Sequence, residues 1–118
     1  MNMNITERQV NATTILTLSG RLVFDARKIF QEAVKSAQAK GPRYLILNLE
    51  QVTYIDSAGL GLLGLLFEEC KVNNRRCGMV RPEGRMNQLI ELTNFPKIVP
   101  TFETEQEALR AQSSFATV

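Results

Sequence analysis

The sequence predicts an α/β fold, with a mixed β-sheet of about five strands and about four α-helices packed on it. Three observations predict this class. The chain opens with two short strand-like runs that are typical of a hairpin. From residue 24 onward, helical and strand-like patterns alternate, which is typical of strands joined by helices. Residues 44–49 (YLILNL) are nearly all apolar, so we expect a central strand buried on both faces.

The first part of the chain divides into a hairpin and a helix. Residues 5–10 and 13–19 are the expected hairpin strands, with Asn11 and Ala12 in the turn between them. From Phe24 onward, apolar residues recur at spacings of three and four, which predicts a helix with one apolar face. The run Lys40-Gly41-Pro42 predicts its end, because glycine readily adopts the left-handed conformation that caps helices.

A second helix is expected directly after the central strand, over residues 57–72. A polar link over residues 73–76 then leads to a strand over residues 77–81. One face of a third helix carries Met86, Leu89, Ile90 and Thr93. We expect this helix to end before Pro96, because proline cannot continue a helix.

The last part of the chain predicts a short strand and a fourth helix. The strand is expected over residues 97–102. Thr104 and Glu107 have the spacing of a capping box, which predicts that a helix starts there and runs to about Gln112. Residues 113–118 have little to hold them, so we expect this tail to be frayed.

Length and composition indicate one globular domain. The chain has 118 residues, so we expect a single domain over residues 1–118 with an ordered core at about 5–112. It is 44% hydrophobic and 22% charged, as ordinary soluble proteins are. The net charge of +2 is too balanced to indicate a nucleic-acid binder, and we expect no nucleic-acid partner.

Several kinds of site and location are not expected. The chain has no histidine, which excludes Ser-His-Asp and Cys-His catalysis. Cys70 and Cys77 do not form a C-x-x-C motif, and no second pair exists for a zinc site. We therefore expect free thiols, no metal and no cofactor. The start of the chain lacks a signal-peptide pattern, and its most apolar stretch, residues 58–67, is about half the ~20 residues that span a bilayer. We expect a cytoplasmic protein without a membrane partner.

Residues 53–64 (TYIDSAGLGLLG) allow several interpretations. Gly59, Gly61 and Gly64 match the G-x-G-x-x-G dinucleotide fingerprint. That fingerprint places its first glycine directly after the strand, whereas here Asp56 and two further residues intervene. Asp56 would also put a negative charge where a pyrophosphate should lie. The structural alternative is that Gly61 and Gly64 let the helix approach the sheet closely.

Ser57 is not expected to be a catalytic nucleophile. A G-x-S-x-G elbow needs glycine two residues before the serine, and this position is Ile55. Capping is another interpretation, because Asp and Ser are both favoured before the first turn of a helix. One helix needs only one such residue, so capping accounts for Asp56 or Ser57 but not readily for both.

A regulatory interpretation accounts for the pair. The free amides and the positive dipole end at a helix N-terminus favour an anion. Phosphorylation of Ser57 would add about −1.5 to −2 charges at pH 7. The fold should tolerate this charge, while the surface offered to a partner would change.

Three segments resemble a known family. Residues 48–61 (NLEQVTYIDSAGLG) are similar to the signature of the STAS domain, and most of all to that of bacterial anti-sigma-factor antagonists. The resemblance includes residues 20–22 (GRL) and residues 87–99 (NQLIELTNFPKIV), and extends over about residues 5–110. It implies the STAS-like mixed sheet with helices that the patterns above predict.

The resemblance also implies a function and partners. Unphosphorylated antagonists bind a serine protein kinase that is also an anti-sigma factor, and so release the sigma factor for transcription. The kinase phosphorylates the serine that follows the aspartate, which is Ser57 here, and the phosphorylated form no longer binds. A serine phosphatase resets this partner switching. The resemblance therefore implies a phosphoprotein that is not itself an enzyme.

The residues expected to bind the partner surround Ser57. Asp56 would orient the turn, and Gly59 and Gly61 would keep the helix start open. Many family members have aspartate where this chain has Val23, and the nearest acid is Asp25. The expected partner-binding set is Asp25, Asp56, Ser57, Ala58, Gly59, Leu60 and Gly61. Another departure is Asn94, where members often have glycine, and asparagine tolerates a left-handed turn.

Further interpretations concern the surface and the class of protein. Leu62, Leu65 and Leu66 widen the apolar arc of the second helix, which indicates a contact patch next to Ser57. The basic residues between Lys71 and Arg85 are expected in a solvated loop, and the alternative is a surface that steers an acidic partner or nucleic acid. The alternative function is an unphosphorylated STAS scaffold subunit in a transport or stress-signalling complex. A small nucleotide-binding module is the third interpretation.

Overall fold

Five strands form a single sheet in the computed structural model, which describes residues 3–112. The strands follow one another across the sheet in chain order. The first pair is antiparallel and every later pair is parallel, so the sheet is mixed as predicted. The strands are β1 (Asn4–Val10), β2 (Thr13–Leu22), β3 (Tyr44–Ile55), β4 (Arg76–Val80) and β5 (Thr101–Phe102). The predicted frayed tail, residues 113–118, lies outside the described residues.

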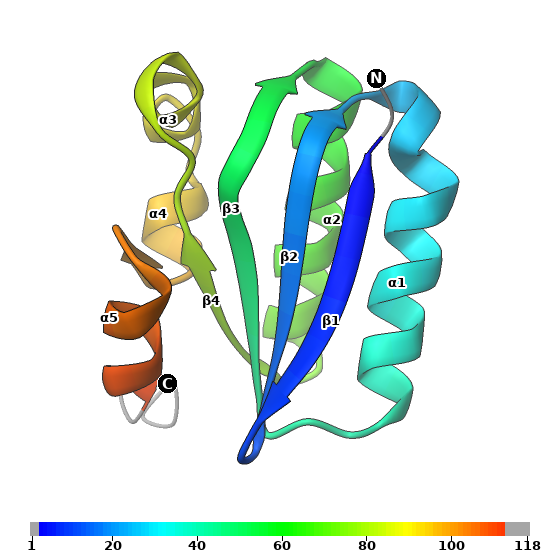
Figure 1. Ribbon diagram of the computed structural model, residues 1–118, viewed down its shortest axis with the longest axis vertical. Helices are drawn as coiled ribbons and strands as arrows, with labels where there is room; N and C mark the ends of the chain where they lie inside the picture. Colours follow the sequence, from blue (N-terminus) through cyan, green and yellow to red (C-terminus); the bar gives the residue numbers. More distant parts are fainter. Residues whose placement is uncertain (1–2, 113–118) are drawn as a thin grey trace.

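Helices connect the strands and cover both faces of the sheet (Figure 1). The first and second α-helices pack on one face, and the last lies against the other face. The helices are the 3-10 turn η1 (Phe24–Ala26), α1 (Arg27–Ala39), α2 (Ser57–Val72), α3 (Gly84–Glu91), α4 (Phe95–Ile98) and α5 (Glu105–Arg110). Among them, none is long and apolar enough to cross a membrane.

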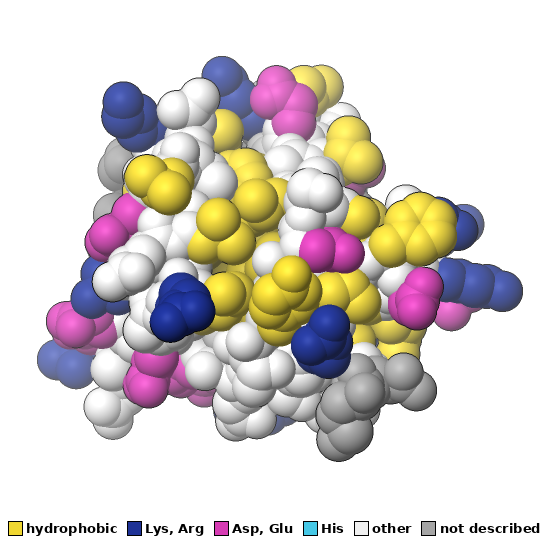
Figure 2. Space-filling model, turned by 90° about the horizontal axis from the view of Figure 1, so that it is seen from above, with side chains coloured by type: hydrophobic (Ala, Val, Ile, Leu, Met, Phe, Trp, Pro, Cys, Tyr) yellow, Lys and Arg dark blue, Asp and Glu magenta, His cyan; other side chains and the backbone are white. Residues whose placement is uncertain are grey.

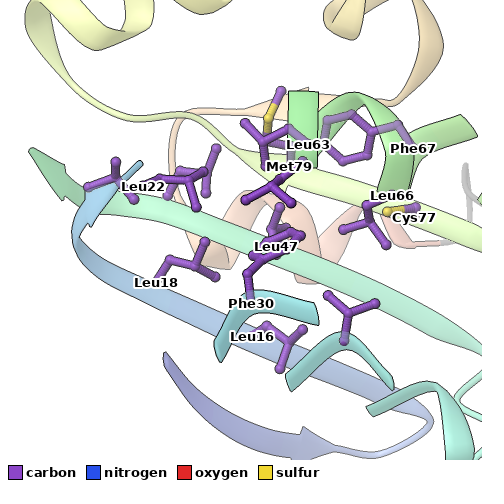
Figure 3. Close-up of a cluster of buried hydrophobic side chains, with 14 of the residues drawn as sticks. Leu16, Leu18, Leu22, Phe30, Leu47, Leu63, Leu66, Phe67, Cys77 and Met79 are labelled. Atoms are coloured by element: carbon purple, nitrogen blue, oxygen red, sulfur yellow. The ribbon is translucent and has the colours of Figure 1, made fainter. Parts of the chain in front are cut away.

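The main core lies between the sheet and the α1–α2 layer. Leu47 of β3 is fully buried, and side chains such as Phe30 of α1 and Leu63 of α2 gather around it (Figure 3). A smaller cluster on the other face joins Ile15 and Ile46 of the sheet to Ala108 of α5. Neighbouring residues of one strand thus belong to different clusters, because successive side chains point to opposite faces. β3 is central and buried on both faces, as its apolar run predicts.

Two predicted turns have the expected backbone. Asn11 in the hairpin has φ +56°, which asparagine tolerates better than most residues. Gly41 has φ +62° directly after the C-cap Lys40, and so ends α1 as predicted. Thr104 caps α5, since its side chain accepts a hydrogen bond from the Glu107 amide. The predicted cap is therefore confirmed, but the reciprocal bond of a capping box is not formed as expected, because Glu107 Oε1 accepts from the Glu103 amide at 3.1 Å and not from the Thr104 amide.

The region around Pro96 differs from the prediction. Pro96 does not merely follow the third helix but lies in the first turn of α4, where its missing N–H is no loss. The Thr93 hydroxyl donates to the Ile90 carbonyl and accepts from the Phe95 amide, and so links α3 to α4. Asn94 has φ −86°, so the expected left-handed turn at this residue is wrong. The last strand is correspondingly short, with only Thr101 and Phe102.

Candidate partner-binding site around Ser57

The turn from β3 into α2 is organised by Asp56. Its backbone is extended, with φ −98° and ψ −177°, and its Oδ1 accepts a 2.7 Å hydrogen bond from the Gly59 amide. Its carbonyl accepts the first helical hydrogen bond, from the Leu60 amide at 2.9 Å. Asp56 is therefore the N-cap of α2.

Asp56 also joins this turn to the end of the neighbouring strand. Its second carboxylate oxygen, Oδ2, accepts from the Phe24 amide at 3.3 Å, and its own amide donates to the Leu22 carbonyl. β2 and β3 are parallel, so their carboxyl ends meet at the same edge of the sheet. One carboxylate thus holds η1 and the start of α2 side by side.

Ser57 is the first residue of α2 and is exposed. Among residues 3–112, no group forms a hydrogen bond with its hydroxyl. The structure thus explains why two residues that favour capping stand together at one helix start. Asp56 performs the capping, and the Ser57 hydroxyl is left available at the positive end of the helix.

The glycines after Ser57 have different environments. A Cβ at Gly59 would lie 2.0 Å from the Leu22 carbonyl oxygen, so only glycine allows this approach of α2 to β2. Gly61 has nothing within 4 Å of such a Cβ, and Gly64 has only an ordinary contact with the Phe95 ring at 3.5 Å. The expectation that Gly61 and Gly64 permit the close approach is therefore wrong. Gly59 is the residue that does so, and it is buried.

An apolar groove begins beside Ser57 and runs between α1 and α2. Its volume is about 560 Å³. Residues from η1 and α1 form one wall and residues from α2 form the other. They are Phe24, Arg27, Gln31, Ala58, Gly61, Leu62, Gly64 and Leu65.

Two hydrophobic side chains of this groove are unusually exposed. Leu65 is 69% exposed and Phe24 is 57% exposed, and the Arg27 guanidinium lies 4.5 Å from the centre of the Phe24 ring. Leu62 and Leu66 are buried, so the widened apolar arc of α2 reaches the surface through Leu65. Figure 2 views the end of the molecule at which β2 and β3 end and α2 begins. Hydrophobic side chains gather on this face, and charged ones surround them.

The predicted contact residues divide by exposure. Asp25, Ser57 and Gly61 are exposed, while Asp56, Ala58 and Leu60 are half-buried. Leu60 packs against the main core. Sequence reasoning missed Phe24 and Arg27. The sequence pattern predicted a helix from Phe24 onward, whereas Phe24 lies in η1 before α1 begins at Arg27, and no sequence signal marked it as exposed.

The site does not have the form of a phosphate-binding loop. α2 begins at Ser57, so Gly59, Gly61 and Gly64 lie inside the helix rather than in a turn before it. The dinucleotide fingerprint needs its first glycine in that turn. Within residues 3–112, there is no group of three or more Cys, Asp, Glu or His side chains that could hold a metal ion.

Comparisons with known proteins show the family to which this chain belongs. A family model described as the STAS domain matches residues 3–108. The anti-sigma-B factor antagonist of Staphylococcus aureus (strain NCTC 8325 / PS 47) is 27% identical over 108 residues, which are 91% of this chain and 100% of that protein. The predicted resemblance is thereby confirmed.

Solved structures share the fold. An anti-sigma factor antagonist from Mycobacterium paratuberculosis superposes with a TM-score of 0.86, at 22% identity over 95% of each chain. The Bacillus cell fate determinant SpoIIAA in its phosphorylated form has a TM-score of 0.69, at 22% identity over 91% of this chain and 97% of that one. These likenesses confirm the predicted α/β class with a mixed sheet.

Proposed function

Because this chain belongs to the STAS domain family, we propose that it is an anti-sigma factor antagonist that is switched off by phosphorylation of Ser57. The observation that carries this proposal is the free, exposed hydroxyl of Ser57 beside an apolar groove. In the unphosphorylated state the chain binds a serine-kinase anti-sigma factor, and the sigma factor is released. A serine phosphatase restores this state.

The described functions and states of similar proteins support the proposal. One relative is an anti-sigma-B factor antagonist, and one structural neighbour is described in a phosphorylated form. We extend both properties to this chain. The domain would comprise residues 1–118, act in the cytoplasm and work as a non-enzymatic partner.

The groove supplies the apolar part of the contact. Phe24 and Leu65 expose large hydrophobic surfaces along the groove that begins beside Ser57, and such side chains contribute strongly when a partner covers them. The exposed Asp25 lies beside Phe24 at the rim of the groove. A rim charge of this kind affects the rate and specificity of association more than its strength.

Phosphorylation would act on this surface without unfolding the chain. The Ser57 oxygen forms a bond to the γ-phosphorus of ATP, the bond to the ADP oxygen breaks, and the serine proton passes to a base of the kinase. Both oxygens of the Asp56 carboxylate already accept hydrogen bonds, from the Gly59 and Phe24 amides. The base is therefore supplied by the kinase, and the antagonist contributes only the Ser57 hydroxyl. The new dianion lies at a helix N-terminus, where the fold tolerates it, but adjoins the apolar contact surface.

The test is an intact-mass measurement with ATP and each purified serine-kinase anti-sigma factor of the source organism. The native protein should gain one phosphoryl group and Ser57→Ala should gain none. Thr53→Ala is the matched control, because Thr53 is also exposed but its hydroxyl donates to the Gly20 carbonyl. This variant should still be modified. Phosphorylation that persists in Ser57→Ala would contradict the proposed site.

A further inference from the structure

A second cavity lies at the opposite end of α2 from Ser57, and it brings the two cysteines together. Cys70 is in the last turns of α2 and Cys77 is in β4, and both line this cavity of about 390 Å³. The Arg75 amide donates a 2.8 Å hydrogen bond to the Cys70 carbonyl, which holds the start of β4 against the helix end. Cys77 points toward α2, beside Leu66 (Figure 3).

The two thiols are free and differ in character. Both are buried, and both line the same cavity between the end of α2 and the start of β4. The hydrogen bond from Cys77 lowers the pKa of Cys70, and this effect and the nearby Arg75 charge outweigh burial and the Glu69 charge. The same hydrogen bond and burial raise the pKa of Cys77 well above its usual range. Of the two thiols, Cys70 is therefore the one that ionises more readily.

Cationic side chains surround the mouth of the cavity. Lys71 and Arg75 are exposed and Arg76 is half-buried, and all three line it. In the described part of the chain, none of the three forms an ion pair with an acid. Several positive charges that line one cavity attract small anions.

We propose that Cys70 and Cys77 form a dithiol–disulfide site that is oxidised by small anionic disulfides. The Cys70 thiolate attacks one sulfur of the small disulfide, whose S–S bond breaks and whose first half leaves as a thiolate. Cys77 loses its proton and attacks the Cys70 sulfur of this mixed disulfide, and the second half leaves as a thiolate. The protein dithiol loses two electrons, and the small disulfide gains them and becomes two thiols. The new bond joins the end of α2 to β4.

The test uses the folded chain and glutathione disulfide as the probe. The native protein should lose about 2 Da, the mass of two hydrogens, and a peptide map should show Cys70 joined to Cys77. Cys77→Ala should stop at one glutathione adduct on Cys70, and Cys70→Ala should react little. If the native protein keeps both thiols while the urea-unfolded protein oxidises, or if adducts form on Cys77 first, the proposal is overturned. The native peptide map decides the matter even where an alanine variant does not fold.

The role of the cations is tested with a pair of oxidants. Lys71→Gln combined with Arg76→Gln should slow oxidation by glutathione disulfide about tenfold, and Arg75 is kept because its charge also lowers the pKa of Cys70. Oxidation by the uncharged 2-hydroxyethyl disulfide should keep its rate, because it gains nothing from the cationic rim. Equal slowing with both oxidants would overturn the preference for anionic disulfides. These measurements do not involve Ser57, so their failure would leave the proposed function standing.

Discussion

At the scale of single residues, Asp56 has the most connected position in the site. Its carboxylate accepts from amides of two different elements, at Gly59 in α2 and at Phe24 in η1. Asp56 therefore determines the position of Ser57 at the start of α2. It also holds Phe24, which forms part of one wall of the groove. A change at Asp56 should therefore affect stability as well as binding.

Replacement of Asp56 tests this dual role. Asp56→Ala removes both acceptors and should lower the free energy of unfolding by about 1–2 kcal/mol. Asp56→Asn is the matched comparison, because its one amide oxygen can still accept from the Gly59 amide while the bond from the Phe24 amide is lost, so it should lower the free energy of unfolding less than Asp56→Ala does. Urea denaturation measures both values. Equal stability of the alanine variant and the native protein would contradict the capping role.

Gly59 and Gly61 provide a second comparison between neighbouring positions. Gly59→Ala places a methyl group against the Leu22 carbonyl and should destabilise the fold by about 1–3 kcal/mol. Gly61→Ala meets open space inside a helix, so it should stabilise by about 0.5–1 kcal/mol. The two shifts in denaturation midpoint should have opposite signs. A Gly59→Ala variant that is as stable as the native protein would contradict the close approach of α2 to β2.

Sequence reasoning reached some of these residues and not others. The Asp-Ser pair after a buried strand predicted both the helix start and Ser57, because capping chemistry is local. It could not decide which glycine touches β2, since that depends on the separation of α2 from the sheet. It missed Phe24 as part of the groove for the same reason, because the groove exists only where η1 packs beside α2.

At the scale of elements, α5 is held to the sheet by a polar bridge. Glu105 forms an ion pair with Arg8 of β1 and accepts a 2.9 Å hydrogen bond from the buried Asn48 of β3. Partial burial raises the pKa of Glu105, but the hydrogen bonds from Arg8 and Asn48 and the charge of Arg8 outweigh it and lower this pKa overall. The ionised carboxylate therefore stabilises the docking of α5.

This bridge predicts a pH dependence. A carboxyl with a lowered pKa in the folded state contributes stability above its unfolded pKa of about 4.3, and loses it as the pH falls through the folded value. The stability difference between native protein and Glu105→Gln should therefore be present at pH 7 and vanish in acid. It should not exceed about 1 kcal/mol, because Arg8 is half exposed. A difference that grows as the pH falls would contradict this assignment.

Two exposed hydrophobic side chains of α2, one in the middle of the helix and one at its end, offer a matched pair for binding. Leu65 and Val72 are similarly exposed, but only Leu65 lines the groove beside Ser57. Leu65→Ala should weaken binding to the kinase by about tenfold, whereas Val72→Ala should not. Both should leave the denaturation midpoint nearly unchanged. Calorimetric titration measures the affinities, and equal losses in both variants would exclude the groove as the contact.

The elements themselves were largely predictable. Residues 57–72 form α2 as expected, because a strong apolar pattern and a cap mark its start. β3 continues beyond the apolar run to Ile55, since pairing with β2 extends it through polar residues. α4 was not predicted, because four residues with a proline carry no periodic pattern.

At the scale of the whole molecule, the fold separates the proposed switch from the parts that maintain stability. The main core lies between the sheet and the α1–α2 layer, while Ser57 lies at the rim with its hydroxyl exposed. A phosphate there changes charge at the surface and displaces no buried side chain. The α/β class was predictable because alternating helix and strand patterns in the sequence determine how helices and sheet form layers. The partner was not predictable in this way, because it depends on exposed side chains that follow no periodic pattern.

The most direct test compares phosphorylated and unphosphorylated protein in one pair of measurements. Protein phosphorylated at Ser57 is titrated against its kinase by calorimetry, and its melting temperature is recorded beside that of the unmodified protein. The account predicts an affinity lower by about tenfold or more, with a melting temperature that is unchanged or slightly raised. Unchanged affinity, or loss of binding together with a lowered melting temperature, would contradict a switch that acts on the surface and leaves the fold intact.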